Sequence, residues 1–492
     1  MELDGTAVDG VELRPAEFWR SLEELDHSPD FEEALQREFP RFADRWPEGL
    51  DRRRFLELMA ASLALAGLGG CESRPAPGKL VPYLETPEEL VQGRPLAFAT
   101  AMPLGGYALG LLVESHMGRP TKVEGNPDHP ASLGATDVFA QASVLSLYDP
   151  DRAETLQRFG QIATREAFLD EVSTQRLIQR GRNGAGLRLL TETVTSPTLA
   201  AQIDALREAF PEAGWHQYEP IHRDHARAGA TAAFGRDVQT VYHLDRADTI
   251  LALDDDFLAT GPAHVRYARD FASRRRALGT AEAAQPPRSM SRLYVVEPTV
   301  TLTGAAADHR LPVRPPGVEA VARLIARRLG LEVDPPADAD RDGVSDEWID
   351  AVVSDLTGEL RGGDSSTSLV TAGFTQPAVV HALAHAINAA LGSVGTTVEY
   401  IEPVEAARAL QTQSLEELAE SLREGEVETL IIIGGNPVFT APAGMDLGRL
   451  LQPVPFTLHL SESVDETSAA CRWHVPQAHF LESWSDARAF DG

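Results

Sequence analysis

Cysteine is scarce in this chain. Only Cys71 and Cys471 occur among its 492 residues. Two thiols exclude a cysteine-bound iron–sulfur cluster, which needs three or four thiolates, and a zinc site built from four cysteines. They also exclude a disulfide framework. Any redox chemistry in this chain therefore requires a bound organic or metal–organic cofactor.

Basic side chains are also scarce relative to acidic ones. The chain carries 44 Lys and Arg against 74 Asp and Glu, a formal charge of −30, and Lys79 and Lys122 are its lysines. Nucleic acids and anionic membrane surfaces bind through net positive protein faces. The composition therefore predicts no nucleic-acid partner. Whether a GC-rich genome or salt adaptation explains the acidity stays open.

One apolar run, residues 55–70, stands out, but it is too short for a comfortable membrane-spanning helix. Arg52-Arg53-x-Phe55-Leu56 before it resembles a twin-arginine export signal, and Gly70-Cys71 at its end resembles a lipoprotein cleavage box. Cys71 is then the candidate for lipidation. The alternative is an amphipathic core helix with an incidental cysteine. We interpret residues 51–71 as the signal and residues 1–50 as an acidic helical extension before it.

The next part of the chain favours antiparallel strands. Apolar alternation from Leu96 to His116, then the turn Met117-Gly118-Arg119-Pro120 and a second strand, predict a hairpin. We assign residues 72–160 to a small β-rich domain.

Beyond residue 160, short aliphatic runs alternate with amphipathic helices, which predicts α/β domains with parallel sheets. The expected strands are 187–194, 247–254, 292–298, 368–374, 429–437 and 456–463. One expected helix begins at Ser196-Pro197 and another ends at Gly330. The acidic stretch 333–346 predicts a boundary between a Rossmann-like domain, 161–332, and a second α/β domain, 347–492, which we expect to be truncated.

The ends of the expected strands do not favour phosphate binding. In open α/β sheets, ligands bind at the carboxyl ends of the strands. Three consecutive acids, Asp254-Asp255-Asp256, follow one strand, and Glu192 follows another. Carboxylates there repel a diphosphate, and no strand leads into G-x-G-x-x-G or a lysine-bearing phosphate loop.

Metal-binding patterns are incomplete. Residues 338–343 resemble the start of a calcium loop, but Ile349 stands where a bidentate Glu belongs, so a solvated acidic linker is favoured. His381 and His385 lie four apart on an expected helix, and His222 and His225 are close in sequence. A satisfied helix face is favoured over a metal site for the first pair. Cys471 is expected to be a buried small hydrophobe.

Several stretches together resemble the molybdopterin oxidoreductase superfamily. They are Gly125-Asn126-Pro127-x-His129-Pro130-x-Ser132, Leu147-Tyr148-Asp149-Pro150-Asp151-Arg152, residues 295–315, Gly435-Asn436-Pro437, and residues 463–487. The resemblance covers residues 96–492 and implies the fold of that superfamily: a small β-rich unit followed by two Rossmann-like units. Residues 136–142, where active members usually carry a cluster-binding cysteine, have none.

The acidic extension, the twin-arginine-like signal and residues 98–143 look like the molybdopterin-oxidoreductase-like subunit of bacterial alternative complex III. That resemblance implies a subunit without molybdenum cofactor or catalytic site, in a complex that oxidises quinol at the periplasmic face of the inner membrane. The motif positions Gly125, Asn126, Pro127, His129, Gly435, Asn436 and Pro437 would then be vestigial. Implied partners are a ferredoxin-like iron–sulfur domain or subunit, a multihaem cytochrome c and quinol-binding membrane subunits.

Two alternatives stay open. The first is an active molybdopterin enzyme without its iron–sulfur centre, with molybdopterin guanine dinucleotide held by residues such as Asn126, Asn436 and 482–487. The second is an exported binding module that uses the acidic loop and a sheet edge for calcium or a protein partner.

Overall fold

The computed structural model describes residues 91, 93–275, 290–337, 340–341, 343–359 and 364–492. The predictions for residues 1–71, with Arg52, Arg53 and Cys71, lie outside these ranges, and so do Asp338 and Asp342 of the calcium-like loop. None of the helices in the described ranges has the length and apolar character needed to cross a membrane.

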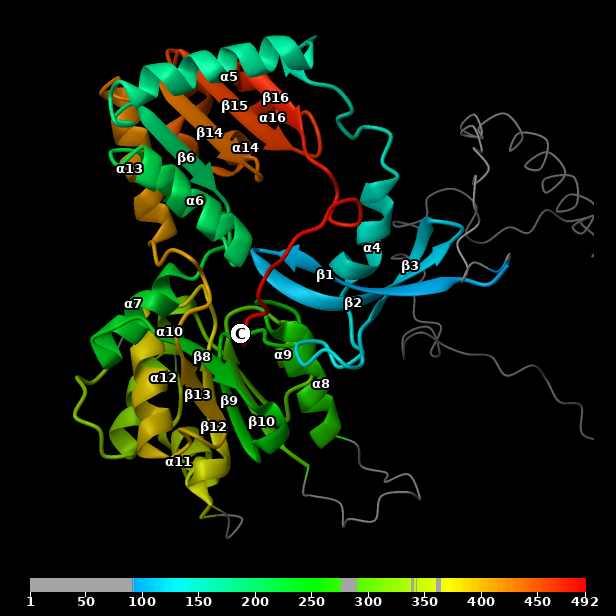
Figure 1. Ribbon diagram of the computed structural model, residues 1–492. Helices are drawn as coiled ribbons and strands as arrows, with labels where there is room; N and C mark the ends of the chain where they lie inside the picture. Colours follow the sequence, from blue (N-terminus) through cyan, green and yellow to red (C-terminus); the bar gives the residue numbers. More distant parts are fainter. Residues whose placement is uncertain (1–90, 92, 276–289, 338–339, 342, 360–363) are drawn as a thin grey trace, which may run out of the picture. The chain divides into compact units, whose positions relative to one another are not determined.

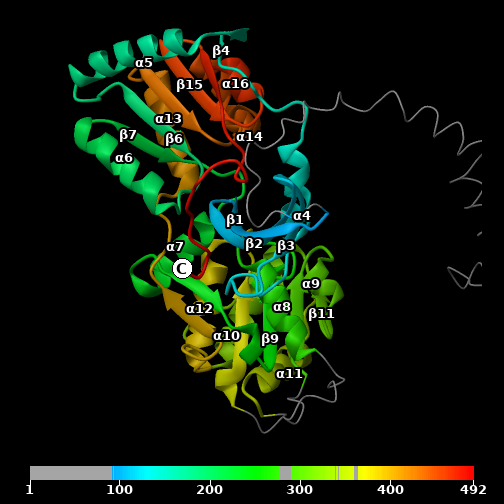
Figure 2. The same cartoon turned by 45° about the vertical axis from the view of Figure 1, so that its right-hand side comes forward.

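The first described element is a three-stranded antiparallel sheet in the order β1 (Leu96–Leu104), β2 (Tyr107–His116), β3 (Arg119–Gly125) (Figure 2). The hairpin predicted around Met117 is present. The single strand predicted before it is wrong, because Gly105 and Gly106 form a two-residue turn that splits it. Their φ angles of +55° and +83° fit the mirror-image turns that match strand twist.

A seven-stranded sheet has five parallel strands and a short antiparallel hairpin at one edge (Figure 1). Its order is β5 (Gln161–Ile162), β4 (Gln157–Arg158), β16 (Trp473–Pro476), β15 (Phe456–Ser461), β14 (Thr429–Ile433), β6 (Leu187–Thr191), β7 (Gly214–Gln217).

Helices cover both faces of this sheet because its central strands are apolar on both sides. Leu430 and Ile432 pack with α13, whereas Ile431 and Ile433 pack with α6. The helices of this region are α5 (Arg165–Arg180), α6 (Pro197–Ala209), α13 (Gln411–Arg423), α14 (Pro437–Thr440), α15 (Leu447–Leu451) and α16 (Glu466–Ala470), with the 3₁₀ turn η4 (Ala443–Met445).

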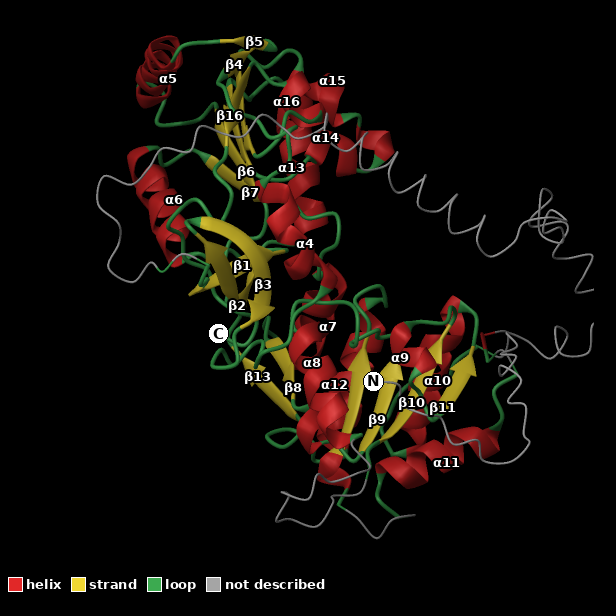
Figure 3. Cartoon of the chain, turned by 90° about the vertical axis from the view of Figure 1, so that its right-hand side faces the viewer, coloured by secondary structure: helices red, strands yellow, loops and turns green. Residues whose placement is uncertain are grey.

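A four-stranded parallel sheet has the order β11 (His309–Pro312), β10 (Arg292–Glu297), β9 (Thr249–Leu253), β12 (Ser368–Ala372) (Figure 3). The antiparallel pair β8 (Gln239–Tyr242) and β13 (Val398–Ile401) forms a separate ladder. The remaining helices are α4 (Val138–Leu147), α7 (Asp224–Phe234), α8 (His264–Arg274), α9 (Leu302–Ala305), α10 (Pro315–Arg328), α11 (Asp346–Leu356) and α12 (Ala378–Ala390), with the 3₁₀ turns η1 (Leu244–Arg246) and η3 (Ser365–Thr367).

Asn388 of α12 closes the outer edge of β12. Its Nδ2 donates to the Val370 carbonyl oxygen at 2.7 Å, and its Oδ1 accepts from the Val370 N–H at 2.9 Å. Asn388 is 1% exposed. A buried strand edge needs such partners, and the amide side chain here supplies the donor and acceptor that another strand would supply.

Local sequence signals explain the helix ends. The Ser196 hydroxyl accepts from the Leu199 N–H at 3.0 Å, and Pro197 takes the first position of α6, as predicted. Gly330, with φ of +83°, follows the last turn of α10, also as predicted.

The predicted division into consecutive α/β domains differs from the observed sheets. Strands β6 and β7 precede residue 333 and β14, β15 and β16 follow residue 346, yet they form one sheet. Likewise, β12 of the four-stranded sheet lies beyond the predicted boundary. A contiguous boundary at 333–346 is therefore wrong. The chain leaves the seven-stranded sheet after β7, builds the four-stranded sheet, and returns through α13.

Candidate functional site

The first family motif, residues 125–132, is folded onto itself and onto β2. The Asn126 side chain accepts from the Asp128 N–H at 3.0 Å, and its backbone carbonyl accepts from the Ser132 hydroxyl at 3.0 Å. The same hydroxyl lies 2.9 Å from the Gly110 carbonyl oxygen. Gly125 is required, because a Cβ there would lie 2.3 Å from the Ala135 carbonyl oxygen.

His129 in this motif also has a structural role. Its ring lies against Gly110, where a Cβ would meet the ring at 2.1 Å. Its Nδ1 accepts from the Ala131 N–H at 3.2 Å. Asn126 Oδ1, His129 Nδ1 and the Ser132 hydroxyl therefore hold a loop in place.

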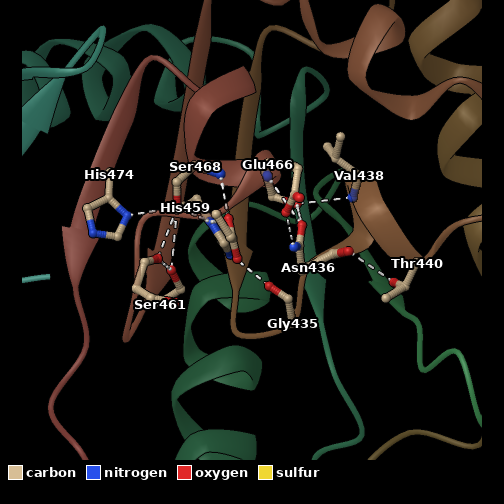
Figure 4. A network of polar contacts seen from close by, with 12 residues as sticks. Gly435, Asn436, Val438, Thr440, His459, Ser461, Glu466, Ser468 and His474 are labelled. Atoms are coloured by element: carbon tan, nitrogen blue, oxygen red, sulfur yellow. Dashed lines mark hydrogen bonds and ion pairs between the residues drawn. The ribbon is translucent and has the colours of Figure 1, made fainter. Parts of the chain in front are cut away.

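The second motif, Gly435-Asn436-Pro437, lies just beyond the carboxyl end of β14 (Figure 4). The Asn436 Oδ1 accepts from the Thr467 hydroxyl at 2.7 Å, and its Nδ2 donates to a Glu466 carboxylate oxygen at 2.6 Å. Its backbone carbonyl accepts from the Thr440 hydroxyl at 3.0 Å. Both ends of the Asn436 amide are thus used inside the protein, joining α14 to α16.

A buried chain of polar side chains lies behind this turn (Figure 4). His459 contacts the Gly435 carbonyl oxygen through Nε2 at 3.0 Å and the Ser468 hydroxyl through Nδ1 at 2.8 Å. The same hydroxyl lies 2.9 Å from Nδ1 of His474. Since a carbonyl oxygen only accepts, Nε2 of His459 carries a hydrogen, while its Nδ1 lies between the Ser468 hydroxyl and the Asp465 carboxylate, which is 3.4 Å away.

This chain of side chains stabilises the turn and does not form a nucleophilic centre. His459, Ser468 and His474 are at most 5% exposed, so no substrate reaches the hydroxyl. Burial lowers the pKa of His474, with the nearby His459 charge acting in the same direction. Burial alone would raise the pKa of Asp465, but hydrogen bonds from His459 and Ser468 hold it below its usual range.

Two carboxylates, Glu192 and Glu219, follow the neighbouring strands β6 and β7. Glu219 is 8% exposed and accepts from the Thr193 N–H at 3.1 Å. Burial, reinforced by the charge of Glu192, raises the pKa of Glu219 to about 7. Glu192 retains exposed surface, yet desolvation by the surrounding protein raises its pKa too, against a hydrogen bond from the Gly435 backbone.

Glu192 lies against the glycines of the second motif. A Cβ on Gly434 would lie 2.4 Å from a Glu192 carboxylate oxygen, and one on Gly435 would lie 3.3 Å from its Cγ. Both glycines have positive φ, at +71° and +63°. A Gly-Gly turn at a strand end is where backbone N–H groups bind a phosphate in many α/β proteins. Here the carboxylate of Glu192 takes that place.

The three aspartates predicted at a strand end do follow β9 and are held by the surrounding elements. Asp254 accepts from Gln376 Nε2 at 2.7 Å, and Asp256 accepts from the Thr303 N–H at 2.8 Å and hydroxyl at 2.7 Å. Burial, with the charges of its two neighbours, raises the pKa of Asp255 to about 6.

Carboxylates also occupy the N-termini of longer helices at the carboxyl edge of the seven-stranded sheet. Asp224 accepts from the first N–H groups of α13, those of Gln411 at 2.9 Å and Thr412 at 3.0 Å. Asp486, near the end of the chain, accepts from the Thr198 hydroxyl of α6 at 2.6 Å. Helix N-termini attract anions, and in this chain the anions are its own side chains.

The described residues therefore do not fit molybdopterin guanine dinucleotide, which brings phosphate groups to such strand and helix ends. The Gly-Gly turn and the starts of α6, α9 and α13 face internal carboxylates. Of the candidate ligands predicted from the sequence, Asn436 uses both ends of its amide in internal hydrogen bonds, and Asn126 uses its Oδ1 in one.

The remaining candidates have structural surroundings. His385 Nδ1 lies 3.1 Å from the Tyr400 hydroxyl, and burial lowers the pKa of His381 to about 3 and of His385 to about 4. His222 Nε2 lies 3.0 Å from the Thr412 hydroxyl. Cys471 is 5% exposed, as expected for a small hydrophobe, and burial raises its pKa to about 12. Within the described ranges, no three His, Cys, Asp or Glu residues are grouped to hold a metal ion.

Three parts of this region escaped prediction from the sequence. Glu219 follows β7, a strand that was not predicted. His459 lies within a predicted strand, but its burial and its contact with the Gly435 turn depend on α16. Asp486 lies in the segment 482–487 that was predicted as a candidate pterin ligand, but its contact with the start of α6, 288 residues away, was not foreseen. The one local signal for such residues is a polar side chain shortly after a strand. For Glu219 this signal could be used only if β7 had been recognised as a strand.

Comparison with known proteins gives the fold. Among solved structures, acetylene hydratase from Pelobacter acetylenicus superposes with a TM-score of 0.52 and 12% sequence identity, over 78% of this chain and 63% of that one. The chain has the fold of acetylene hydratase. The molybdopterin oxidoreductase-like α/β fold predicted from the sequence is thereby confirmed.

Sequence comparison adds a curated relative. The chain is 24% identical over 424 residues to the molybdopterin-binding-like subunit of menaquinone reductase from Nitratidesulfovibrio vulgaris. The match covers 79% of this chain and 59% of that protein. The chain thus spans about three-fifths of the length of the relatives named here. No protein-family model matches the sequence.

Proposed function

We propose that this chain is a cofactor-free, molybdopterin-oxidoreductase-like subunit of a membrane complex that transfers electrons to or from quinone. Its role is to hold redox subunits in position. The relative named as a subunit of menaquinone reductase supports the link to quinone chemistry. The finer assignment, which rests on the family resemblance, is to the quinol-oxidising alternative complex III, at the periplasmic face of the membrane.

One observation carries the proposal: the chain's own carboxylates take the anion-binding positions at the strand ends. Glu192 lies against the Gly434-Gly435 turn, and Asp256 takes the start of α9. A phosphate group at either position would lie within a few ångströms of a carboxylate. Two unit negative charges 4 Å apart repel by about 4 kcal/mol near a protein surface.

The proposed partners are those implied by the resemblance. They are a ferredoxin-like iron–sulfur domain or subunit, a multihaem cytochrome c and quinol-binding membrane subunits. In this proposal the redox groups are bound by these partners and not by this chain.

The test is elemental analysis of the purified full-length protein for molybdenum, tungsten and iron, together with oxidation of an extract to fluorescent pterin. We expect neither molybdenum nor tungsten, no pterin, and iron only where a cluster-bearing part is present. Stoichiometric molybdenum or tungsten with pterin would refute the proposal and favour the active enzyme.

Glu192→Gln removes one of the negative charges at the strand ends, and the variant is produced in a host that makes the cofactor. If the proposal holds, its molybdenum content stays at background. A gain of pterin would instead show that Glu192 alone keeps the cofactor out. Glu208→Gln on the exposed side of α6 is the matched control, since it changes the charge equally.

A further inference from the structure

The outer edge of β1 is a long strand edge without a partner among the residues that the structure describes. β1 is the first strand in the order β1-β2-β3, and it pairs only with β2 there. Its nine residues, Leu96–Leu104, include no charged side chain. Soluble proteins usually protect such an edge with charges, bulges or a covering element, because it can pair with another chain.

The register identifies the backbone groups that face this open edge. On β2, the Gly110 carbonyl oxygen accepts from the Asn126 N–H, and the Ala108 N–H donates to the Arg488 carbonyl oxygen. These groups point away from β1. In an antiparallel ladder, when the backbone groups of one residue point away from the neighbouring strand, those of the residue opposite it also point out of the ladder. The residues opposite Gly110 and Ala108 are Ala101 and Pro103.

The alternate residues Ala97, Ala99, Ala101 and Pro103 therefore direct their backbone outward. The three alanines offer both N–H and C=O groups, and Pro103, which has no N–H, offers its C=O group. Proline at an outward position agrees with this register, because there it removes no hydrogen bond of the β1–β2 ladder.

The surface around this edge is apolar. Phe98 is 54% exposed and Leu104 is 42% exposed. On the same small sheet, but against β3, helix α4 exposes Val138 and Leu145 at 71% each while it buries Ser143. A helix that turns apolar side chains outward and a serine inward is arranged for a surface that another molecule covers.

We propose that β1 accepts an extended segment of another subunit as an added strand. This proposal rests on the proposed function as a subunit of a complex. The segment is an uncharged strand on a protein whose facing surface is net positive. Charge complementarity favours that occupant over a second copy, because each copy of this chain carries a formal charge of −30.

Hydrogen exchange measured by mass spectrometry on the native assembly and on the isolated full chain tests this directly. The peptide covering 97–101 is expected to exchange more than about tenfold more slowly in the assembly. Equal rates in the two samples would refute the added strand and leave the proposed function standing. Protection that grows with concentration in the isolated chain would identify a second copy as the occupant and overturn the proposal.

A variant pair gives a second readout. Ala99→Pro removes one outward N–H without breaking the β1–β2 ladder, whereas Ala99→Val keeps the N–H and adds β-branching. We expect Ala99→Pro to lower the yield of assembled complex by more than about tenfold, with Ala99→Val near wild type. Cross-linking through Ala99→Cys must give a product with a partner subunit, and a product within the same chain would overturn the proposal.

If no assembly forms and the purified chain carries molybdenum and pterin, the proposed function fails together with this inference. An assembly that forms with an exchanging β1 edge removes the inference alone.

Discussion

Replacing Glu219 with glutamine should stabilise the protein at alkaline pH. Burial and the nearby Glu192 raise the pKa of Glu219 from its usual 4.5 to about 7. A rise of that size corresponds to about 3 kcal/mol of penalty on the ionised form. Glutamine keeps an oxygen that accepts from the Thr193 N–H, which lies 3.1 Å from the carboxylate. Glu219→Gln is therefore expected to raise the unfolding free energy by about 2 kcal/mol at pH 8.

The direction of the pH dependence follows from linkage. A carboxyl group whose pKa is higher in the folded state binds its proton more tightly there, so the wild type loses stability as pH rises from 4.5 to about 7. Glu219→Gln removes that loss. Below pH 4.5, the unfolding free energies of the variant and the wild type should therefore converge. Thermal unfolding of the full chain at pH values on both sides of this window measures the difference.

The matched control is Glu208→Gln, which makes the same charge change on the exposed side of α6. It should shift the melting temperature little at any pH. If Glu219→Gln destabilised the protein at pH 8, or if the control matched its effect, a desolvated carboxyl group at the end of β7 would be the wrong explanation.

Two further substitutions probe the supporting structure. Asn388→Ala should lower the unfolding free energy by about 3 kcal/mol, because both Val370 backbone groups lose their buried partners. Urea denaturation measures this difference, and a loss under about 1 kcal/mol would contradict the prediction. Asp137→Asn should lower the pKa of His264, measured by NMR titration: burial lowers that pKa, but the ion pair with Asp137 at 3.1 Å outweighs it. Folding raises the His264 pKa, so the stabilisation from this ion pair is fully present below the ordinary histidine pKa. It is lost as the pH rises through the pKa of His264 in the folded protein. The loss of unfolding free energy in Asp137→Asn should therefore become smaller at high pH.

The sequence was informative about elements whose signal is local. The expected strand at 429–437 contains β14, because Thr429–Ile433 is a continuous β-branched and aliphatic run. The start of α6 was evident from Ser196-Pro197. By contrast, β16 (Trp473–Pro476) has four residues and a buried histidine, so it lacks the apolar pattern of a predicted strand.

What could not be predicted depends on contacts far apart in the chain. Strand order in the seven-stranded sheet pairs β6 with β14, which lie more than 230 residues apart, and no local pattern encodes that pairing. The Gly105-Gly106 turn was missed because the apolar residues on both sides run on like one strand. For the site, the Asp254–Asp256 run was found because it is contiguous, but Glu192 meets the Gly434 turn only after the sheet has assembled.

The structure explains how this chain can contain stretches that resemble the motifs of a cofactor-binding family and, in the proposed function, hold no cofactor. The Ser132 hydroxyl joins a loop to β2, the Asn436 amide joins α14 to α16, and the buried Glu297 pairs with Arg310. Each of these contacts lies within the protein and involves a group that is costly to leave unpaired. The motifs are therefore evidence for the fold, whereas binding must be judged from atoms that remain free to face a ligand. At the strand ends of this chain, carboxylates such as Glu192 and Asp256 already take the backbone groups that would face a ligand's phosphate.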